Sequence, residues 1–337
     1  MSQSIRVAVE ESSQTGEARR AARNLAQECG FDETRTEEVA IVVTEVCTNL
    51  LKHAGGGEIL LRTTSDYPDH APELELLALD RGSGIGNLEQ ALRDGFSTGG
   101  SPGQGLGAIV RLSSASDFYS DSRWGAAVLA RWPVQSIKGR HRKDPFRFGA
   151  VNVSKPGQEV CGDSWGAMQS ESGATLMVAD GLGHGPEAQT ASLEAVRILH
   201  SNGALSPGEL LERTHQALRS SRGAAVAVAQ IDYANQMLVF AGVGNISGQI
   251  YAGAEPRQHL VSVNGTAGHQ SQRIREFPYP WPLNGMLVMH SDGLSSQTGL
   301  EAHAGLALRD PSLIAGVLYR DFARRNDDAT VVVAKSA

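Results

Sequence analysis

The sequence lacks a disulfide pattern, a long apolar run and a secretory signal pattern. Only 3 of its 337 residues are cysteines, and they lie far apart without CxxC or Cys/His spacing. It therefore predicts neither a disulfide scaffold nor a cysteine-ligated metal site. Its longest apolar runs, such as Val39–Val43 and Ala224–Ala229, are far shorter than the ~20 residues that span a bilayer. We expect a cytoplasmic protein with free thiols and no membrane partner.

An excess of positive charge is also absent. The 30 Lys and Arg residues stand against 37 Asp and Glu residues, for a net charge of −7. This balance argues against a general nucleic-acid binder. Composition is that of a globular protein, with 41% hydrophobic residues, and excludes a disordered chain. Glycine is abundant, with 38 residues and no three-residue period, so we expect local glycine-rich loops rather than collagen.

A length of 337 residues favours two domains, and residues 135–147 divide the chain. This stretch combines Arg140, Arg142 and Lys143 with Pro145, a composition typical of a solvated linker. A docking site for an acidic partner is the alternative. No internal repeat is visible, so residues 1–134 and 148–337 are expected to form two different domains, both of α+β sandwich type.

Hydrophobic periodicity and the positions of glycine and proline predict the main elements. A capping box at Thr34–Glu37 is expected to open a long helix that runs to about Ala54 and stops at Gly55. The other predicted elements are the strands Ile5–Val9, Ile59–Thr63, Leu74–Leu79, Ala126–Trp132, Thr175–Ala179, Ala224–Ile231, Met237–Ala241, Met286–Met289 and Thr330–Ala334, and the helices Thr15–Cys29, Ala108–Ser113, Pro186–Ser201 and Pro207–Arg219.

The long predicted helix carries Glu45, Asn49 and His53 at four-residue spacing, in one row beside its apolar stripe. Polar side chains beside a core need partners, and an oxygen-rich row suits Mg²⁺ with its phosphates and water. Taken alone, such a row is more often a solvated helix edge.

Two glycine loops follow in the same half. Asp80 begins Asp-Arg-Gly-Ser-Gly-Ile-Gly directly after an apolar strand, and Gly103-Gln-Gly-Leu-Gly leads into a predicted helix. Glycine lets the backbone approach a ligand, an aspartate can accept a hydrogen bond from an amine, and a helix amino terminus offers N–H groups to phosphate. Neither loop has a P-loop lysine or a following βαβ unit, which excludes Walker and Rossmann sites.

Taken in order, Glu45-x3-Asn49, the Asp80 loop and the Gly103 loop resemble the N, G1 and G2 boxes of the GHKL (Bergerat) ATPases, and Leu88–Gly100 resembles RsbT-type switch kinases. The resemblance covers about residues 5–133 and implies an α/β sandwich that binds ATP with Mg²⁺. It implies that Asn49 ligates Mg²⁺, that Asp80 holds the adenine amine and that Glu45 is the general base. His53 matches no catalytic position and is interpreted as structural. The residues implied to shape the pocket or its lid are Gly82, Gly84, Ser97, Thr98, Gly103, Gly105, Leu106 and Gly107.

In the second half, four aspartate positions stand where strands are expected to end. Asp163, Asp180 and Asp292 each adjoin a glycine, and the pair Asp327–Asp328 precedes a strand. One such aspartate is usually a turn or helix cap. Converging carboxylates demand cations, and an all-oxygen set favours Mg²⁺ or Mn²⁺ over zinc. Two such ions can clamp a phosphoryl group and generate hydroxide.

The order GDxxG, DGxGHG, SDG and DDxT resembles the SpoIIE-type branch of the phosphatase 2C family, and most of all the RsbX-type phosphatases. It implies an αββα sandwich in which Asp180 bridges two metals. Asp163 with the carbonyl of Gly181 would complete one metal site, and Asp292 with Asp327 the other. Asp328 is expected behind these ligands, although the sequence allows the pair to exchange roles. Leu182 replaces the histidine of the wider family, so His184 is interpreted as a structural loop residue.

Together the resemblances imply a serine/threonine kinase-like domain joined to an opposing Mg²⁺- or Mn²⁺-dependent serine/threonine phosphatase. The implied shared substrates are STAS-domain proteins of the anti-anti-sigma or stressosome type. In the alternative, the first domain binds nucleotide, transfers nothing and regulates the phosphatase; a downstream phosphatase or anti-sigma-type regulator would be a further partner. A pair of inactive scaffold domains is the third interpretation. The sequence leaves the oligomeric state open and is compatible with a homodimer.

Overall fold

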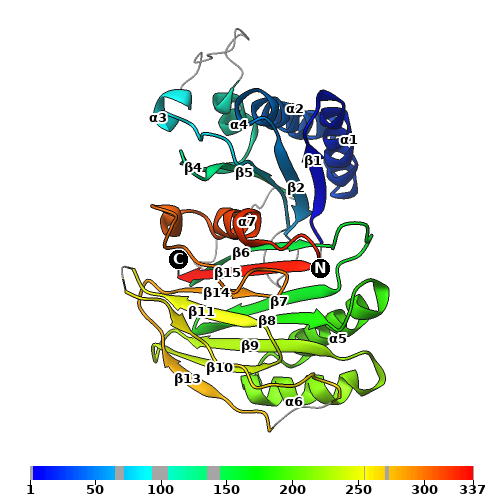
Figure 1. Cartoon of the computed structure of the whole chain (residues 1–337), viewed down its shortest axis with the longest axis vertical. Helices are drawn as coiled ribbons and strands as arrows, with labels where there is room; N and C mark the ends of the chain where they lie inside the picture. Colours follow the sequence, from blue (N-terminus) through cyan, green and yellow to red (C-terminus); the bar gives the residue numbers. More distant parts are fainter. Residues whose placement is uncertain are drawn as a thin grey trace.

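The computed structural model describes residues 3–64, 72–92, 105–134, 145–253, 255–269 and 273–336. Within these residues the elements stack in six layers (Figure 1). A layer of helices covers one sheet, a single helix follows, and then come two facing sheets and a final pair of helices. The single helix in the middle of the stack is α7 (Pro311–Phe322).

The amino-terminal domain is a five-stranded antiparallel sheet with helices on one face. Its strand order is β1-β2-β3-β5-β4. Apolar side chains on alternate strand positions, such as Ile59, Leu61, Leu74 and Leu76, form a core with the helices. The elements are β1 (Ile5–Val9), α1 (Ser12–Glu28), α2 (Glu33–Asn49), η1 (Leu50–Ala54), β2 (Gly57–Thr63), β3 (Glu73–Leu79), α3 (Leu88–Ala91), α4 (Leu106–Leu112), β4 (Ala115–Asp121) and β5 (Gly125–Pro133).

Helix α2 differs from the prediction at both ends. Its N-cap is Asp32, which accepts a hydrogen bond from the Arg35 amide at 2.8 Å. The predicted capping box at Thr34–Glu37 is therefore wrong, because an equally good capping residue lies two positions earlier. After Asn49 the chain makes one π-helical turn, η1, which ends at Gly55 with φ 72°. Such turns are frequent at functional sites, and this one separates Asn49 from His53.

The carboxy-terminal domain is the predicted αββα sandwich. Its sheets have the orders β13-β10-β9-β8-β7 and β12-β11-β14-β15-β6. Large apolar side chains fill the space between them, among them Phe146, Trp165, Phe240 and Val332. The elements are β6 (Phe146–Val153), β7 (Asp163–Ser170), β8 (Gly173–Gly181), α5 (Pro186–Asn202), α6 (Pro207–Ala217), η2 (Leu218–Ser220), β9 (Ala224–Asp232), β10 (Met237–Val243), β11 (Ser247–Tyr251), β12 (Gln258–His259), β13 (Phe277–Pro280), β14 (Met286–His290), η3 (Leu306–Leu308), α7 and β15 (Ala329–Ser336).

The end of the predicted linker needs a correction. Strand β6 begins at Phe146, so Phe146 and Arg147 belong to a sheet rather than to the linker. The alternating apolar residues Phe146, Phe148 and Ala150 are buried in the core, and Phe146 is 1% exposed. Residues 135–144 lie outside the described part of the chain, so the rest of the linker stays a prediction.

Helix α7 packs against both domains. Residues Pro311 to Arg320 are all buried. Its Leu313 and Val317 belong to one apolar cluster with Leu77 and Leu129 of the amino-terminal sheet and with strands β6, β14 and β15. A Cβ at Gly149 of β6 would overlap the backbone of Ser312, so that strand needs glycine where the helix crosses it. The helix thus completes the cores of two domains at once.

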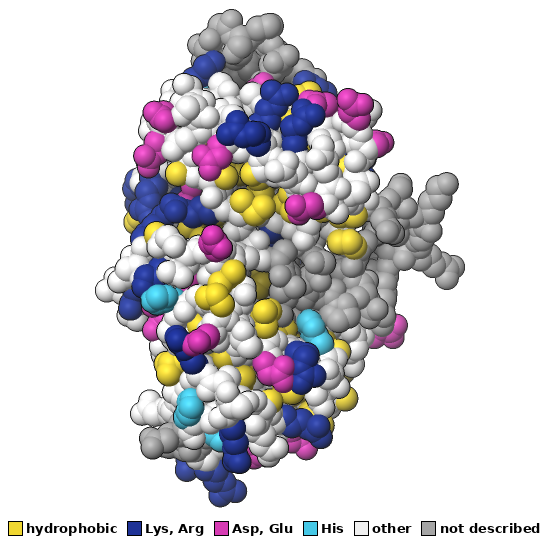
Figure 2. All heavy atoms as spheres, turned by 90° about the vertical axis from the view of Figure 1, so that its right-hand side faces the viewer, with side chains coloured by type: hydrophobic (Ala, Val, Ile, Leu, Met, Phe, Trp, Pro, Cys, Tyr) yellow, Lys and Arg dark blue, Asp and Glu magenta, His cyan; other side chains and the backbone are white. Residues whose placement is uncertain are grey.

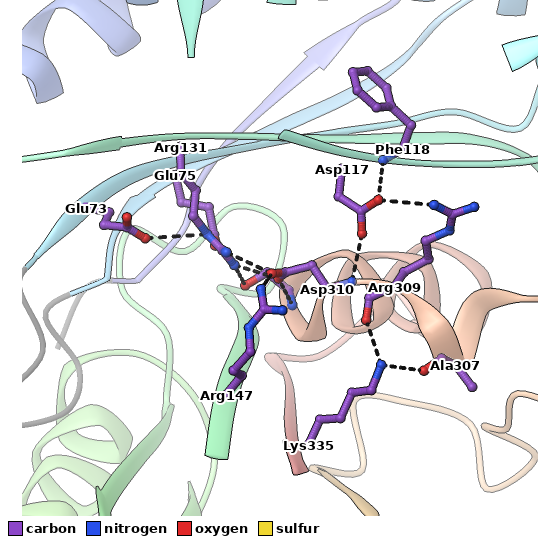
Figure 3. A network of polar contacts seen from close by, with 11 residues as sticks. Glu73, Glu75, Asp117, Phe118, Arg131, Arg147, Ala307, Arg309, Asp310 and Lys335 are labelled. Carbon is purple, nitrogen blue, oxygen red and sulfur yellow. Dashed lines mark hydrogen bonds and ion pairs between the residues drawn. The ribbon is translucent and has the colours of Figure 1, made fainter. Parts of the chain in front are cut away.

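A polar network holds the amino-terminal end of α7 (Figure 3). Arg131 of β5 donates to both carboxylate oxygens of Asp310, at 2.9 and 2.6 Å, and to Glu75 at 2.7 Å. Arg147 of β6 also donates to Asp310. Burial alone would raise the pKa of Glu75, but the charges of Arg62 and Arg131 outweigh it and lower the pKa to about 2.

The surface turned toward the viewer in Figure 2 mixes basic and acidic side chains over most of its area. A group of Lys and Arg side chains lies at the top of this view, over the amino-terminal domain. In the residues that the structure describes, no helix is both long and apolar enough to cross a membrane.

We expect Glu75→Gln to lower the free energy of unfolding at neutral pH by about 3–5 kcal/mol, because Arg62 and Arg131 lose a buried partner. The folded-state pKa of about 2 lies below the unfolded value of about 4.3. The ionised side chain therefore stabilises the fold above about pH 4.3, and this contribution disappears as pH falls toward 2. Urea unfolding at several pH values measures it.

The gap between wild type and Glu75→Gln should accordingly close on acidification. The matched control is Glu212→Gln, at an exposed glutamate of α6, which should change stability by no more than about 0.5 kcal/mol. A gap that stays constant down to low pH would contradict the assignment.

Candidate functional site

A cavity of about 430 Å³ opens between α2, η1 and the loop after β3. Its size is that of a small-molecule site. Six residues predicted from sequence line it: Glu45, Asn49, Asp80, Gly84, Gly105 and Leu106. Gly82 packs beside the cavity against Ala54 of η1, and Gly107 is buried in α4. Ser97, Thr98 and Gly103 lie outside the described residues.

Backbone donors fix the carboxylate of Asp80. Its Oδ1 accepts hydrogen bonds from the amides of Gly82 at 2.8 Å and Ala126 at 3.0 Å. Holding one oxygen sets the orientation of the whole group at the end of β3. A carboxylate so held at a cavity wall can accept a hydrogen bond from an amine.

Glu45 and Asn49 lie one turn apart on α2, and both are half-buried at the cavity. Burial raises the pKa of Glu45, against the opposing positive charge of Lys52. A carboxyl group whose pKa moves toward neutrality is a more effective general base. His53, exposed on η1, also lines the cavity, a position that its interpretation as a structural residue did not anticipate.

A second group of predicted residues converges in the carboxy-terminal domain. Asp163 and Asp180 are cross-strand partners on β7 and β8, so Asp163 begins a strand rather than ending one. Asp292 follows β14 and Asp327 precedes β15. Asp180 shares hydrogen bonds with both Asp163 and Asp292. We call Asp163, Asp180, Asp292 and Asp327 the acid cluster.

Three members of the acid cluster have a pKa above the ordinary range of aspartate. Burial and the charges of its neighbours raise the pKa of Asp180 to about 9 and that of Asp163 to about 7. Burial and the charge of Asp327 also raise the pKa of Asp292. Among the described residues, no group of three or more His, Cys, Asp or Glu side chains is arranged so that it could hold a metal ion as it stands. Divalent cations bind oxygen ligands and relieve the repulsion between neighbouring carboxylates.

The adjacent Asp327 and Asp328 have different surroundings. Asp328 is 3% exposed, and its carboxylate accepts hydrogen bonds from the amides of Lys155 at 2.7 Å and Gly162 at 2.9 Å. Its oxygens thus hold the backbone in front of Asp163. Asp327 instead faces Asp180 and Asp292 closely enough to raise the pKa of both.

Two further residues hold the acid cluster. The Ser291 hydroxyl donates to Asp163 at 2.7 Å and accepts from the Thr330 amide at 3.1 Å. Asn245, in the turn between β10 and β11, donates to Asp292 at 2.7 Å. Sequence reasoning missed Asn245, although its glycine-rich turn, Gly242-Val-Gly-Asn, signals a close approach of backbone. The side chains of Leu182 and His184 are exposed.

The two sites match known families. Residues 8–132 match the model of the histidine kinase-like ATPase domain, and residues 170–336 match that of stage II sporulation protein E (SpoIIE). The serine/threonine-protein kinase RsbT of Bacillus subtilis is 31% identical over 116 residues, which cover 34% of this chain and 86% of RsbT. The chain belongs to the histidine kinase-like ATPases. Its second half carries a SpoIIE-type domain.

Relatives of the SpoIIE-type domain show the same fold. The phosphoserine phosphatase RsbX of Bacillus subtilis is 22% identical over 143 residues, covering 42% of this chain and 72% of RsbX. A crystal structure of RsbX in complex with magnesium has a TM-score of 0.51 at 19% identity, over 60% of this chain and all of that chain. A structure reported for the bacterial stressosome has a TM-score of 0.52 at 25% identity, over 56% of this chain and 98% of that one. The predicted pair of domain families is confirmed.

We expect Asn245→Ala to weaken Mn²⁺ binding by about 10–100-fold, the usual effect of removing a group that orients a metal ligand. The shift of the melting temperature during a Mn²⁺ titration measures this affinity. Asn235→Ala is the matched control, because Asn235 donates to Asp232 at the same distance, 2.7 Å, in a turn between β9 and β10. Equal Mn²⁺ affinities of the two variants would argue against a role for Asn245.

Proposed function

We propose that the chain is a metal-dependent protein-serine/threonine phosphatase joined to an ATP-dependent serine/threonine kinase. The observation that carries the proposal is the acid cluster, in which burial, and after it the charges of Asp163, Asp292 and Asp327, raise the pKa of Asp180. Such a group is costly to ionise without cations. RsbX, whose fold this domain shares, is a phosphoserine phosphatase, and one of its structures contains magnesium.

The carboxylate and carbonyl oxygens present are the donor types that divalent cations bind, and we propose that two ions bind here. In our proposal Asp180 contributes to both sites, Asp163 and the carbonyl of Gly181 complete one, and Asp292 with Asp327 complete the other. When bound, two Mg²⁺ or Mn²⁺ ions polarise the phosphoryl oxygens and supply hydroxide for in-line attack. Ser291 and Asn245 orient Asp163 and Asp292 through their hydrogen bonds. Asp328 keeps the Gly162 backbone in place.

The amino-terminal cavity would hold ATP with Mg²⁺. Asp80 would accept a hydrogen bond from the adenine amine, and Asn49 would ligate the ion. Glu45 would accept the proton of the substrate hydroxyl, and burial moves its pKa in the direction that a base requires. A non-catalytic nucleotide switch is the second candidate function, but binding alone does not require a half-buried carboxyl group one turn from the proposed metal ligand. For this reason we favour phosphate transfer.

The substrates we propose are STAS-domain proteins, from which one domain removes phosphate and to which the other adds it. The support is the joint presence of an RsbT-like and an RsbX-like domain, together with the similarity to a stressosome structure. We place the protein in the cytoplasm and propose 1–134 and 148–337 as its domains. Its partners then include the phosphorylated STAS proteins and the regulators that those proteins bind.

Hydrolysis of p-nitrophenyl phosphate tests the phosphatase. Wild type should turn over with Mn²⁺, and Asp180→Asn should lose about 100-fold or more, because removing an electrostatic group from the reacting centre costs about 10²–10³ in rate. Asp232→Asn, at an aspartate of the β9–β10 turn outside the acid cluster, is the control and should keep full activity. Undiminished turnover in Asp180→Asn would sink the two-metal assignment.

Transfer of label from ATP to a STAS protein tests the kinase. The experiment uses Asp180→Asn protein, so that no phosphatase removes the label. Adding Glu45→Gln should reduce labelling by about 10²–10⁴-fold, the usual contribution of a general base, while ATP still binds. Unlabelled STAS protein in the presence of bound ATP would favour the non-catalytic switch instead.

A further inference from the structure

We infer that nucleotide in the amino-terminal cavity controls the phosphatase centre through Arg320 and the segment 320–328. The inference deepens the proposed function and depends on it, since it takes the cavity as a nucleotide site and the acid cluster as a catalytic centre. Its basis is a short, continuous set of contacts that begins at the cavity and ends at Asp327.

The first contact joins α7 to the cavity wall. Arg320 is 1% exposed, and its Nη1 donates to the carbonyl oxygens of Asp80 at 2.8 Å and Ala126 at 3.1 Å. Asp80 and Ala126 both line the cavity, and they are hydrogen-bonded to each other. The fold is strongly destabilised when a buried guanidinium loses its hydrogen-bond acceptors. A movement of the end of β3, where Asp80 would contact adenine, therefore changes the hydrogen bonds of Arg320.

The second contact anchors the same guanidinium in the carboxy-terminal domain. Nε and Nη2 of Arg320 donate to the two carboxylate oxygens of Asp321, at 2.9 and 2.7 Å. Arg81, the residue after Asp80, donates to the carbonyl oxygen of Arg320. Groups beside the cavity, Asp80 and Arg81, thus contact Arg320 at the carboxy-terminal end of α7, where Arg320 also pairs with Asp321. We call this set of contacts the junction.

From this junction the chain runs directly to the acid cluster. Ser295 donates to the carbonyl oxygen of Phe322 at 2.9 Å, and the Arg324 amide donates to the carbonyl oxygen of Gly293 at 2.8 Å, next to Asp292. A Cβ at Gly293 would overlap the Asp328 carbonyl. Segment 320–328 is therefore hydrogen-bonded to the Asp292 loop and contacts Gly293 closely at Asp328, next to Asp327.

A second tie fixes the middle of the segment to the amino-terminal domain. Arg325 has φ 63°, a left-handed conformation that is costly for a residue other than glycine. Its guanidinium donates to both oxygens of Glu58 on β2, at 3.1 and 2.7 Å. The segment is thus held by the amino-terminal sheet at two points, and a shift of that sheet moves the backbone that positions Asp327.

The test measures Mn²⁺-dependent turnover of p-nitrophenyl phosphate by the full chain, with and without ADP at constant total Mg²⁺ and Mn²⁺. We expect ADP to change wild-type turnover by about fivefold or more, the lower range of coupling between two sites. Arg320→Lys keeps the charge but cannot reproduce the planar set of bonds, and it should bind ADP without changing turnover. Arg325→Asn tolerates the left-handed backbone, leaves Glu58 its Arg6 partner at 2.6 Å, and should weaken the response.

The matched control is Arg309→Ala. Arg309 also pairs across the domains, with Asp117 at 3.3 Å, but at the other end of α7 and away from the cavity, so the variant should respond as wild type does. Hydrogen exchange of peptide 320–328 gives a readout that is independent of activity. We expect ADP to change this exchange in wild type, because the segment connects the two sites.

The outcomes separate this inference from the proposed function. Binding of ADP to a chain that hydrolyses p-nitrophenyl phosphate, with no change in either the turnover or the hydrogen exchange, would contradict the coupling. That result would leave both proposed sites unaffected. An Arg320→Lys protein that responds as wild type does would exclude the route. A chain that binds no ADP overturns the nucleotide site and this inference with it, and direct binding measurements show that separately. If turnover is absent, the phosphatase fails, and the exchange of peptide 320–328 decides the coupling.

Discussion

The burial of α7 between two sheets is the contact on which the rest of the structure depends. The amino-terminal sheet and the sheet that contains β6, β14 and β15 each have one face covered within their own domain and another face against which α7 packs, together with Leu294, Leu300 and Leu306. An apolar sheet face exposed to water is unstable, so neither domain is complete without this helix. The cavity and the acid cluster consequently have a fixed relation to each other, because both are built at strand ends of sheets that share one core.

Carboxylates in this chain fall into two environments with opposite pKa shifts. Glu58 and Glu75 at the domain boundary face arginines, which lower their pKa below the ordinary range despite burial. Asp163 and Asp180 face other carboxylates, which together with burial raise theirs. The first arrangement is stable as it stands and joins the domains. The second is relieved by protonation or by the cations that we propose, and perturbed acids of this kind are candidates for a functional site.

Much of the fold and site could be predicted because apolar strands and glycine loops are local signals. Strand Ile5–Val9 was predicted with its observed bounds, and each predicted acidic residue of the SpoIIE-type domain lies in or beside the acid cluster. Helix α7 was not predicted. It is buried on all sides, so its sequence Leu-Ile-Ala-Gly-Val-Leu-Tyr shows no polar face from which a helical period could be recognised. Asn245 was not predicted because its partner Asp292 is 47 residues away, and a local pattern does not show such a contact.

A helix that belongs to two cores also has a genetic meaning. A destabilising lesion in either sheet loosens α7 and, with it, the opposite sheet, so both domains are lost together rather than one at a time. Two separate proteins could vary in ratio through gene dosage or turnover. In this chain one of each domain is present per molecule, and neither can outlast the other, so their balance has to be set within the folded molecule rather than by the amounts of two proteins.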